Sequence, residues 1–460
     1  MERINKMLNA TTEMKKWAPV LEHADAPAFR DDYRKQVTAK LLENTEKALQ
    51  EENAQSNFLS ENNQTASAVQ NYDPVLISLV RRAMPNLIAY DVAGVQPMSG
   101  PTGLIFAMKS RLGSKDSPGS GLIDTNDAEA FFTEPNTDFS TGKDSGANAN
   151  YTTADETDPA FGTADAGSPE TEVTNFSTGI STRAGEQDFF NDMGFTIEKS
   201  TVTAVTRGLK AEYTMELAQD LKAIHGLDAE SELANILSTE ILGEINREVI
   251  RSINASAELG ARNDDTQGAS ANRGTAQTGS FSLTTDADGR WSGEKFKSLL
   301  TQIQLECNTV AKRTRRGKGN YVICSSNVAS ALAATGQLDY QHDGLNVDDT
   351  ANTFAGTLTG GIKVYIDPYA VTDYATVGYK GTSPYDAGLF YCPYVPLTMV
   401  RAIDEQTFQP KIGFKTRYGM IANPFASGEG ATITDGSLGP VRANRFFRIF
   451  RVQNINVEDA

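Results

Sequence analysis

The sequence predicts an α+β fold, in which long helices and groups of strands occupy separate stretches of the chain. Three observations support this class. Residues 228–254 have the apolar periodicity of a long amphipathic helix, residues 195–214 alternate and are rich in β-branched side chains, and residues 361–420 read as short strands separated by turns. At 460 residues the chain is long enough for two or three domains.

The composition is that of a globular protein with one strongly acidic segment. The chain is 39% hydrophobic and 22% charged, and its net charge of -17 argues against a protein that wraps nucleic acid. Residues 113–192 contain 16 Asp or Glu against 3 Lys or Arg, a balance of -13, so the rest of the chain carries about -4. This block is rich in Gly, Ser, Thr and Asn, and we expect it to be an insertion of loops and short strands.

The N-terminal head is predicted to be a polar helix followed by an exposed linker. Within residues 29–49, Tyr33, Val37 and Leu41 belong to an apolar stripe that repeats every four residues, while charges fill the other faces. Such a narrow stripe buries little area, so this helix should dock on another surface. Residues 53–70 are rich in Asn, Gln, Ser and Ala, as expected for an exposed linker.

Beyond the linker, apolar segments begin to recur. A short helix is expected over residues 74–83, because Pro85 cannot continue it. Residues 102–111 are expected to form a strand, and residues 195–214 a long strand or a pair of strands.

The clearest helix of the chain covers residues 228–254. Asp228 is placed as its N-cap, and Glu230 and Glu232 stand in the first turn, where the helix dipole favours them. Its apolar stripe is unbroken and is flanked by Ile236, Leu242 and Ile250; the stripe consists of Leu233, Leu237, Ile241, Ile245, Val249 and Ile253. At 1.5 Å per residue this rod is about 39 Å long, and we expect it to be the backbone of one domain.

The C-terminal part mixes helices and strands. An amphipathic helix is expected over residues 291–311, a buried strand over 320–324 and a short helix over 327–334. Short strands and turns follow over 361–420, and residues 444–455 are expected to form a last strand.

No constellation of catalytic residues is evident. None of the three histidines has a second ligand three or four residues away, which argues against a histidine metal site or triad; they are His23, His225 and His342. The chain lacks GxSxG, Walker A and GxGxxG motifs. The sequence therefore predicts a protein that is not an enzyme, with no cofactor, no metal and no catalytic residue.

Three charged clusters are candidate binding sites. Residues 286–289 resemble the start of a calcium loop, but its twelfth position is Lys297 where Glu is needed, so a solvated turn is favoured. A solvated loop face is likewise favoured over weak cation binding for Asp155, Glu156 and Asp158. The basic run 312–318 lacks interleaved aromatic residues, so a solvated loop is favoured, and an acidic neighbouring subunit is a better partner for it than nucleic acid.

The cysteines and the N-terminus indicate the compartment. Three cysteines stand far apart without CxxC spacing, as expected for free thiols in a reducing cytoplasm; they are Cys307, Cys324 and Cys392. No apolar run of about 18 residues predicts a transmembrane helix, and the N-terminus lacks the apolar core of a secretory signal.

Three strings of sequence resemble one family, the major capsid proteins of T-even-type tailed bacteriophages. They are VRRAMPNLIAYDVAGVQPMSGPTG at residues 80–103, KAEYTMELAQDLKAIHGLDAESELANILSTEILGEINREV at residues 210–249, and FQPKIGFKTRYGMIANPF at residues 408–425. Weaker similarity covers most of the rest. The acidic block is the main departure, because it resembles the family's inserted domain in position but is shorter and of different composition.

The resemblance implies the tailed-phage major capsid fold of the Hong Kong ninety-seven type. That fold has an N-arm, a two-stranded E-loop, a peripheral domain on a long spine helix, and an axial domain. Residues 1–61 are expected to be a cleaved, scaffold-contacting propeptide, followed by the N-arm at 62–96. Residues 97–216 would form the E-loop region, which contains the acidic insertion at about 113–192. The peripheral domain, with its spine helix at 228–254, would cover 217–290, the axial domain would cover 291–402, and residues 403–460 would return as strands to both domains.

The family also implies where the precursor is cut. Its maturation protease favours a hydrophobic residue, any residue, then Glu, which Leu59, Ser60 and Glu61 match within the expected linker, so the cut would precede Asn62. Residues 41–43 and 242–244 match as well. Both lie in expected helices, where a protease cannot easily take an extended backbone.

The implied function is structural: self-assembly into hexameric capsomers of an icosahedral or prolate head that encloses DNA without binding it specifically. The implied partners are further copies of the chain, a capsid vertex protein, internal scaffold proteins, the prohead maturation protease and the portal, with outer decoration proteins left open and no membrane. Assembly is expected in the host bacterial cytoplasm and the final location is the virion. The alternatives are a vertex (penton) protein of the same family and, distantly, a secreted surface-layer or adhesin protein.

Overall fold

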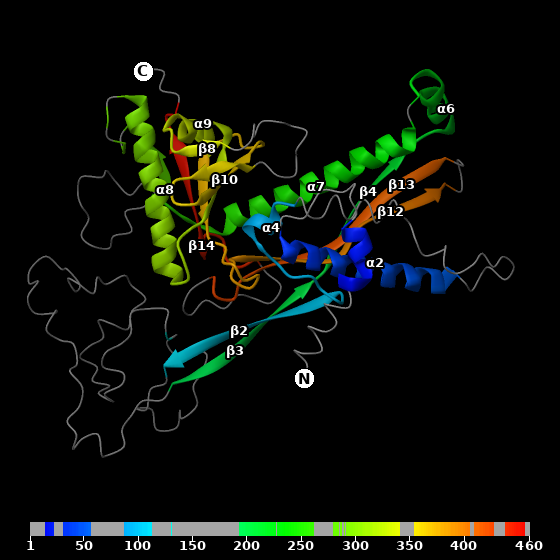
Figure 1. The fold of residues 1–460 in the computed structure, drawn as a ribbon, viewed down its shortest axis with the longest axis horizontal. Coiled ribbons are helices and arrows are strands. Elements are labelled where there is room, and N and C mark those ends of the chain that lie inside the picture. Colours follow the sequence, from blue (N-terminus) through cyan, green and yellow to red (C-terminus); the bar gives the residue numbers. More distant parts are fainter. Residues whose placement is uncertain are drawn as a thin grey trace, which may run out of the picture.

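The computed structural model describes residues 14–22, 31–56, 87–112, 130, 193–226, 228–261, 279–284, 286–287, 289, 291–340, 354–404, 409–426 and 438–455. These residues form two sheets and a separate two-stranded hairpin, with helices packed between and around them (Figure 1). The α+β class expected from the sequence is confirmed.

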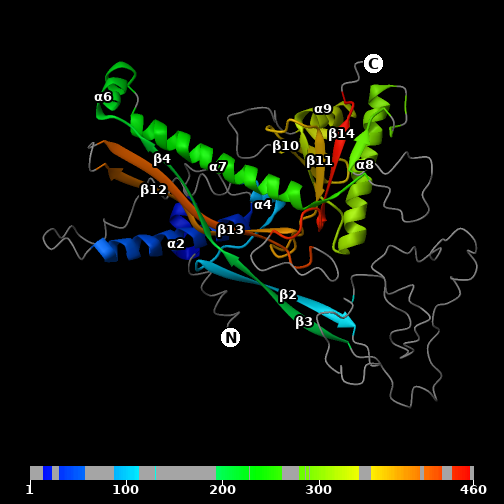
Figure 2. The same ribbon diagram turned by 180° about the vertical axis from the view of Figure 1, so that it is seen from behind.

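The first sheet has four strands in the order β1-β12-β13-β4, and the long helix α7 runs along it (Figure 2). Its strands are β1 (Gly94–Val95), β12 (Leu389–Ile403), β13 (Pro410–Ala422) and β4 (Val205–Glu212). Helix α7 covers Ala229–Ser256. Arg207 of β4 forms ion pairs of 2.7 Å with both Glu244 and Glu248 of α7, which joins the helix to the sheet.

The second sheet has eight strands and is covered on both faces. Its order is β5-β14-β11-β7-β10-β9-β8, with β6 pairing β14; the strands are β5 (Ala257–Leu259), β6 (Ser280–Ser282), β7 (Tyr321–Ser325), β8 (Leu338–Tyr340), β9 (Phe354–Leu358), β10 (Ile362–Asp367), β11 (Tyr374–Gly378) and β14 (Asn444–Gln453). Helices α8 (Ser292–Thr314) and α9 (Ser326–Ala334) pack on one face.

Strand β7 shows why this sheet has an unbroken apolar run. All five of its residues are buried, and successive side chains point to opposite faces. Tyr321 and Ile323 belong to the core that contains α7, whereas Val322 and Cys324 belong to the core beneath α8 and α9. A strand buried on both faces needs no polar alternation.

The remaining elements lie around this body. Strands β2 (Thr102–Leu112) and β3 (Met193–Thr203) form the hairpin, on the opposite side of the molecule from helix α6 (Met215–Ile224) (Figures 1 and 2). Helix α2 (Asp32–Ser56) and the short helix α4 (Ala89–Val92) complete the described elements.

The helix expected over residues 228–254 is confirmed as α7, with two differences in detail. Asp228 occupies the N-cap position, but its side chain makes no capping hydrogen bond. Ile241, Ile245, Val249 and Ile253 are fully buried, whereas Ile236, expected to flank the stripe, is 61% exposed. The reason is that only the C-terminal half of α7 reaches the space between the two sheets.

The strands expected at residues 102–111 and 195–214 are confirmed, the latter as β3 and β4, which belong to different sheets. The expectation of only short strands over 361–420 is wrong for β12 and β13, which have 15 and 13 residues. β12 continues past Pro393 because its register with β13 shifts there, and a shift of this kind accommodates a residue without an N–H. The helices at 291–311 and 327–334 and the last strand are confirmed as α8, α9 and β14.

The expected domain boundaries remain predictions. β12, most of which falls within the expected axial segment 291–402, lies between β1 and β13 in the four-stranded sheet. β14 enters the eight-stranded sheet, where it pairs with β11 and runs parallel to β5 at the end of α7. The helix expected at residues 74–83 and the acidic block lie outside the described residues, apart from Ala130.

The burial of α7 leads to a first prediction. Replacing Ile245 by Ala should lower the free energy of unfolding by about 2–5 kcal/mol, because the cavity lies between two sheets. The matched change Ile236→Ala in the same helix should stay within about 0.5 kcal/mol, since this side chain is exposed. Urea unfolding followed by circular dichroism measures both, and equal losses would contradict the packing described here.

Candidate assembly surfaces

The outer face of the β2–β3 hairpin is apolar and exposed. Its two strands pair over their whole length, and side chains on one face include Leu104, Phe106 and Met108 of β2 with Met193, Phe195 and Ile197 of β3. Each of these six is between 51% and 64% exposed. We call these six residues the outer hairpin face. Lys199, opposite Phe106, and Ser110, opposite Phe195, lie on the same side among them. Exposed apolar surface of this extent marks a site of protein association.

The inner face of the hairpin is buried against the body. Ile105 and Val202 pack with Met98, Phe390 and Ile421 in a small core of their own. Two-stranded hairpins are marginal in isolation, so this core supplies the stability that the base of the hairpin needs. The outer hairpin face is thus displayed on an anchored element.

Further along the inner face, buried charges replace apolar side chains. Lys109 and Arg111 are both buried and both pair with Glu198 of β3, at 2.9 and 3.0 Å. The Lys109 ammonium also lies over the ring of Phe425, which the Arg316 guanidinium approaches as well, at 4.9 Å. Cation–π contacts of this kind join the hairpin to the connection between α8 and β7.

Helix α2 docks on its own chain. Its middle turns are buried nearly all round, because the four-stranded sheet lies on one side and the helical residues 14–21 on the other. Val37, Leu41 and Leu42 are in the main core, and Trp17 and Leu21 join them from the preceding segment. The expected helix and its docking are therefore present, but the buried surface is wider than the narrow stripe that the sequence indicated.

Polar contacts fix the register of this docking. The Asn44 amide donates to the carbonyls of Met98 and Tyr394, at 2.8 and 3.0 Å, and the Tyr33 hydroxyl donates to the carbonyl of Val95. Arg34 forms an ion pair with Asp91 of α4. Sequence reasoning missed these contacts, because Asn44 and Arg34 are residue types expected in solvent.

Helix α6 presents a second exposed apolar surface. None of its residues is buried, and Met215, Leu217 and Ile224 are all more than half exposed. The Thr214 hydroxyl accepts a hydrogen bond from the Leu217 N–H, which caps the helix. A capped amphipathic helix with no buried side chain is a further candidate for contact with another molecule.

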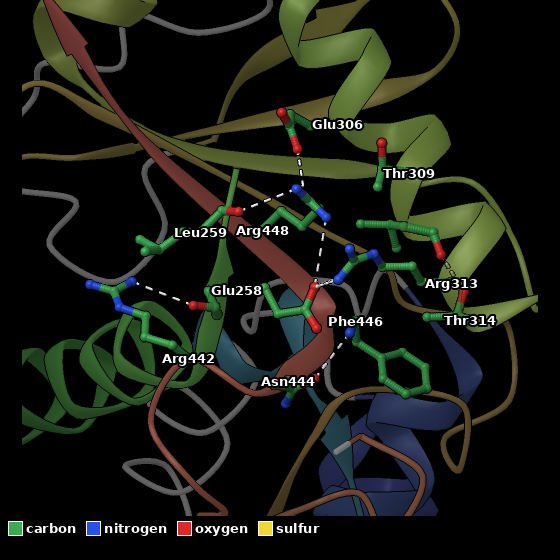
Figure 3. A network of polar contacts seen from close by, with 12 residues as sticks. Glu258, Leu259, Glu306, Thr309, Arg313, Thr314, Arg442, Asn444, Phe446 and Arg448 are labelled. Carbon is green, nitrogen blue, oxygen red and sulfur yellow. Dashed lines mark hydrogen bonds and ion pairs between the residues drawn. The ribbon is translucent and has the colours of Figure 1, made fainter. Parts of the chain in front are cut away.

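A buried polar network holds the end of α7 to the eight-stranded sheet (Figure 3). Arg448 of β14 is 1% exposed, and its Nε donates to Glu306 of α8 at 2.6 Å. Glu306 also accepts from the Ala261 N–H and from Gln302, both at 2.7 Å. Glu258 of β5 pairs with Arg313 at 2.5 Å and with Arg448 at 3.7 Å. Both carboxylates are thus compensated by cations from other elements.

The basic run 312–318 ends α8 and begins the connection to β7. Arg313 and Arg316 are engaged within the chain, with Glu258 and Asp386 respectively, while Lys312, Arg315 and Lys318 are exposed. Arg315 closes the helix in the left-handed conformation, at φ 52°. The run is thus a helix-to-strand connection, as favoured from the sequence, although two of its cations are structural.

The other sequence candidates are scattered. The Asp286 carboxylate accepts from the backbone N–H of Ser282 at 2.9 Å, which favours the turn. His225 is exposed at the end of α6. Several candidates lie outside the described residues: His23, His342, Asp155, Glu156, Asp158 and the cleavage residues Leu59, Ser60, Glu61 and Asn62.

The thiols are unreactive. Cys307, Cys324 and Cys392 are free and buried, and burial raises the pKa of each to about 12, so that the thiolate is scarce at neutral pH. Within the described part of the chain, no three His, Cys, Asp or Glu side chains gather as a metal site would need. No described helix has the length and apolarity to cross a membrane.

Anchored but exposed apolar faces, together with a core held by structural ion pairs, define a protein that is built to assemble with other molecules. The comparisons identify the kind of assembly. Residues 69–452 match the family model "Major capsid protein Gp23". The chain belongs to this family, whose members are structural proteins and not enzymes.

Relatives match along most of their length. The major capsid protein of Vibrio phage KVP40 is 41% identical, with 84% of this chain and 83% of the relative covered. That of Enterobacteria phage T4 is 38% identical, with 90% and 91% covered. The capsid vertex protein of phage T4 is 28% identical over 51% of this chain and 54% of its own length.

Solved structures of phage capsids also match. A chain of the capsid of Myoviridae phage XM1 gives a TM-score of 0.37 at 8% identity, with 79% of this chain and 92% of that chain covered. A chain of the mature capsid of bacteriophage PhiM1 gives 0.35 at 11% identity, with 79% and 85% covered.

The network of Figure 3 generates a second prediction. Arg448→Met should lower the free energy of unfolding by about 3–5 kcal/mol, because Glu306 is left as an uncompensated buried charge. Adding Glu306→Leu should recover much of this loss, since it removes that charge. As a control, Arg401→Met breaks an exposed ion pair with Glu230 and should cost ~0–1 kcal/mol. Urea unfolding compares the three, and an additive double variant would contradict the pairing.

Proposed function

We propose that this chain is the repeating subunit of a phage head and forms hexameric capsomers through the outer hairpin face. Membership in the Gp23 family supports the shell, and the exposed hairpin supports the mode of contact. An 11-residue strand at about 3.3 Å per residue is roughly 36 Å long, so the outer hairpin face is an extended surface for a neighbouring subunit. The exposed apolar hairpin is the single observation that carries this proposal.

A second copy of the chain is the partner that suits this face. A shell places identical subunits side by side, so the same arm is covered in every copy. Specific interfaces commonly bury more than about 1,000 Å² in total, and a long flat arm adds such area without a larger core.

We further propose that residues 1–61 are a propeptide removed by a maturation protease after Glu61. Helix α2 lies on the body as a separate element, and the motif at residues 59–61 follows it. The other two motifs are poor substrates, because Leu41 and Leu42 are fully buried in α2 and residues 242–244 lie within α7. Loss of α2 would uncover apolar surface of the four-stranded sheet, so that maturation would be accompanied by repacking.

The remaining partners follow from a head of this type. Internal scaffold proteins, the protease, the portal and the vertex protein would contact the chain during assembly in the host cytoplasm, and decoration proteins would bind outside if present. The DNA would be enclosed without specific binding, as expected for a chain of net charge -17.

A vertex protein of the same family is the second candidate. The T4 vertex protein matches half of the chain at 28% identity, whereas the T4 major capsid protein matches 90% of it at 38%. This difference favours the role of major subunit. The distant alternative, a surface-layer or adhesin protein, has no support from the relatives.

The hairpin contact is tested by placing a charge on its outer face. Phe195→Asp should leave a folded chain that forms no shells, because its cross-strand neighbour is the uncharged Ser110 and a carboxylate would be buried without a cation in each contact. Phe195→Leu is the matched control and should still assemble. Circular dichroism checks the fold and electron microscopy counts shells; normal shells of Phe195→Asp would show that this face is not the interface.

The cleavage is tested with Glu61→Ala. This variant should accumulate particles whose subunits keep the full precursor mass, because the protease loses its recognition residue. Glu244→Ala changes the competing motif in α7 and should be processed normally. Mass spectrometry of purified particles reads the N-terminus. Full-size, DNA-filled heads of Glu61→Ala without the head segment would show that the cut lies elsewhere.

A further inference from the structure

The carboxylate of Asp91 lies where helix α2 meets the body of the molecule. Asp91 belongs to α4, and its side chain is 13% exposed. Its Oδ1 accepts from Arg34 of α2, whereas its Oδ2 is buried and has no hydrogen-bond partner. One oxygen of this largely buried carboxylate therefore bonds to the proposed propeptide, and the other oxygen makes no hydrogen bond.

A second cation, Lys380, contacts the residue that precedes Asp91. Lys380, in the connection that follows β11, donates from its Nζ to the carbonyl of Tyr90, the residue before Asp91. The Asn320 side chain fixes the Lys380 backbone by accepting from its N–H at 3.1 Å and donating to its carbonyl at 2.6 Å. The lysine is thus anchored at its backbone and has its ammonium next to α4.

The electrostatics around Lys380 agree with this geometry. Burial lowers the pKa of Lys380 to about 8, Asp91 and Asp31 oppose this change, and Arg34 and Lys363 add to it. The Arg34 guanidinium therefore competes with Lys380 for the same anion. Without Arg34, the charge of Asp91 would act on Lys380 alone.

We propose that Asp91 exchanges its cation: it pairs with Arg34 while α2 is docked and with Lys380 once residues 1–61 have left. This inference rests on the propeptide proposed above. Departure of Arg34 would otherwise leave a largely buried carboxylate without compensation, which is strongly destabilising. Lysine suits the second role, because its ammonium has three N–H donors on a flexible stem. It can therefore keep its hydrogen bond to the Tyr90 carbonyl and also donate to Oδ2 of Asp91.

The exchange lowers the cost of losing α2, because Asp91 keeps a cation after Arg34 has gone. Before removal, Asp91 ties α4 to the propeptide; afterwards it ties α4 to the connection between β11 and β12. A returning α2 would have to displace Lys380 from Asp91, so redocking would gain less from Arg34 than it would beside an unpaired carboxylate.

The exchange is tested by the reactivity of Lys380 toward acetic anhydride at pH 8 in the full-length chain, read by peptide mass spectrometry. In Arg34→Met the lysine should pair with Asp91; a rise of its pKa by about one unit lowers the neutral, reactive fraction roughly fivefold. Adding Asp91→Asn should abolish this slowing. Slowing that persists with Asp91→Asn, or no slowing in Arg34→Met, would overturn the exchange.

Lys35→Met is the matched control. Lys35 is the next cation of α2 and pairs with Glu22 instead, so its loss should leave the reactivity of Lys380 unchanged. If Arg34→Met does not fold, wild-type precursor shells and matured particles provide the comparison, and Lys380 should react more slowly in the matured ones. Equal rates in the two would overturn the exchange.

The two proposals can fail separately. The masses of the subunits in matured particles report whether residues 1–61 are gone. If every subunit retains them, the propeptide assignment fails, while the full-length Arg34→Met comparison still decides whether Lys380 can take over Asp91.

Discussion

The burial of one half of α7 between two sheets is the constraint on which the rest of the structure depends. Ile241, Ile245 and Val249 contact a single core that also includes side chains from α2, α4, the long strands β12 and β13, and the near face of the eight-stranded sheet. Because both sheets and the N-terminal head share one core with this helix, the helix fixes how they are placed relative to one another. The buried network of Arg448, Glu306 and Glu258 then fixes the point where α7 ends and the second sheet begins.

The elements that project from this core share one property: their apolar surface is not covered by the chain itself. The hairpin has a buried inner face and an exposed outer one, and α6 has no buried residue at all. Apolar surface left in water is a cost for a monomer, and it is recovered only when another molecule covers it. For a member of a capsid protein family this division is reasonable, because a shell covers such surface when its subunits meet. Helix α2 is the opposite case, an N-terminal element whose Val37, Ala39, Leu41 and Leu42 are buried by its own chain.

Much of this could be predicted from the sequence, and the failures have physical causes. The stripe of α7 and the alternation of β3 were visible because helices and strands repeat with fixed periods. The length of β12 was not, because Pro393 looks like a turn until the pairing register is known. The exposure of Phe106 and Ile197 could not be predicted either, since alternation indicates that one face of a strand is apolar but not whether the rest of the chain covers that face. Arg34 and Asn44 looked like solvent-facing residues, and only their partners at Asp91, Met98 and Tyr394 make them interior.

The sequence by itself determined the α+β class, the main helices and strands, the absence of a recognisable catalytic motif and the resemblance to phage capsid proteins. These properties follow from local periodicity, from composition and from short sequence motifs, all of which depend only on the order of residues along the chain. Only the tertiary structure decided which apolar faces are buried and which await a partner, that α2 docks on its own body, and that Asp91 lies between two cations. Such facts depend on contacts between residues far apart in the chain, and no local pattern encodes the distance between Arg34, Asp91 and Lys380.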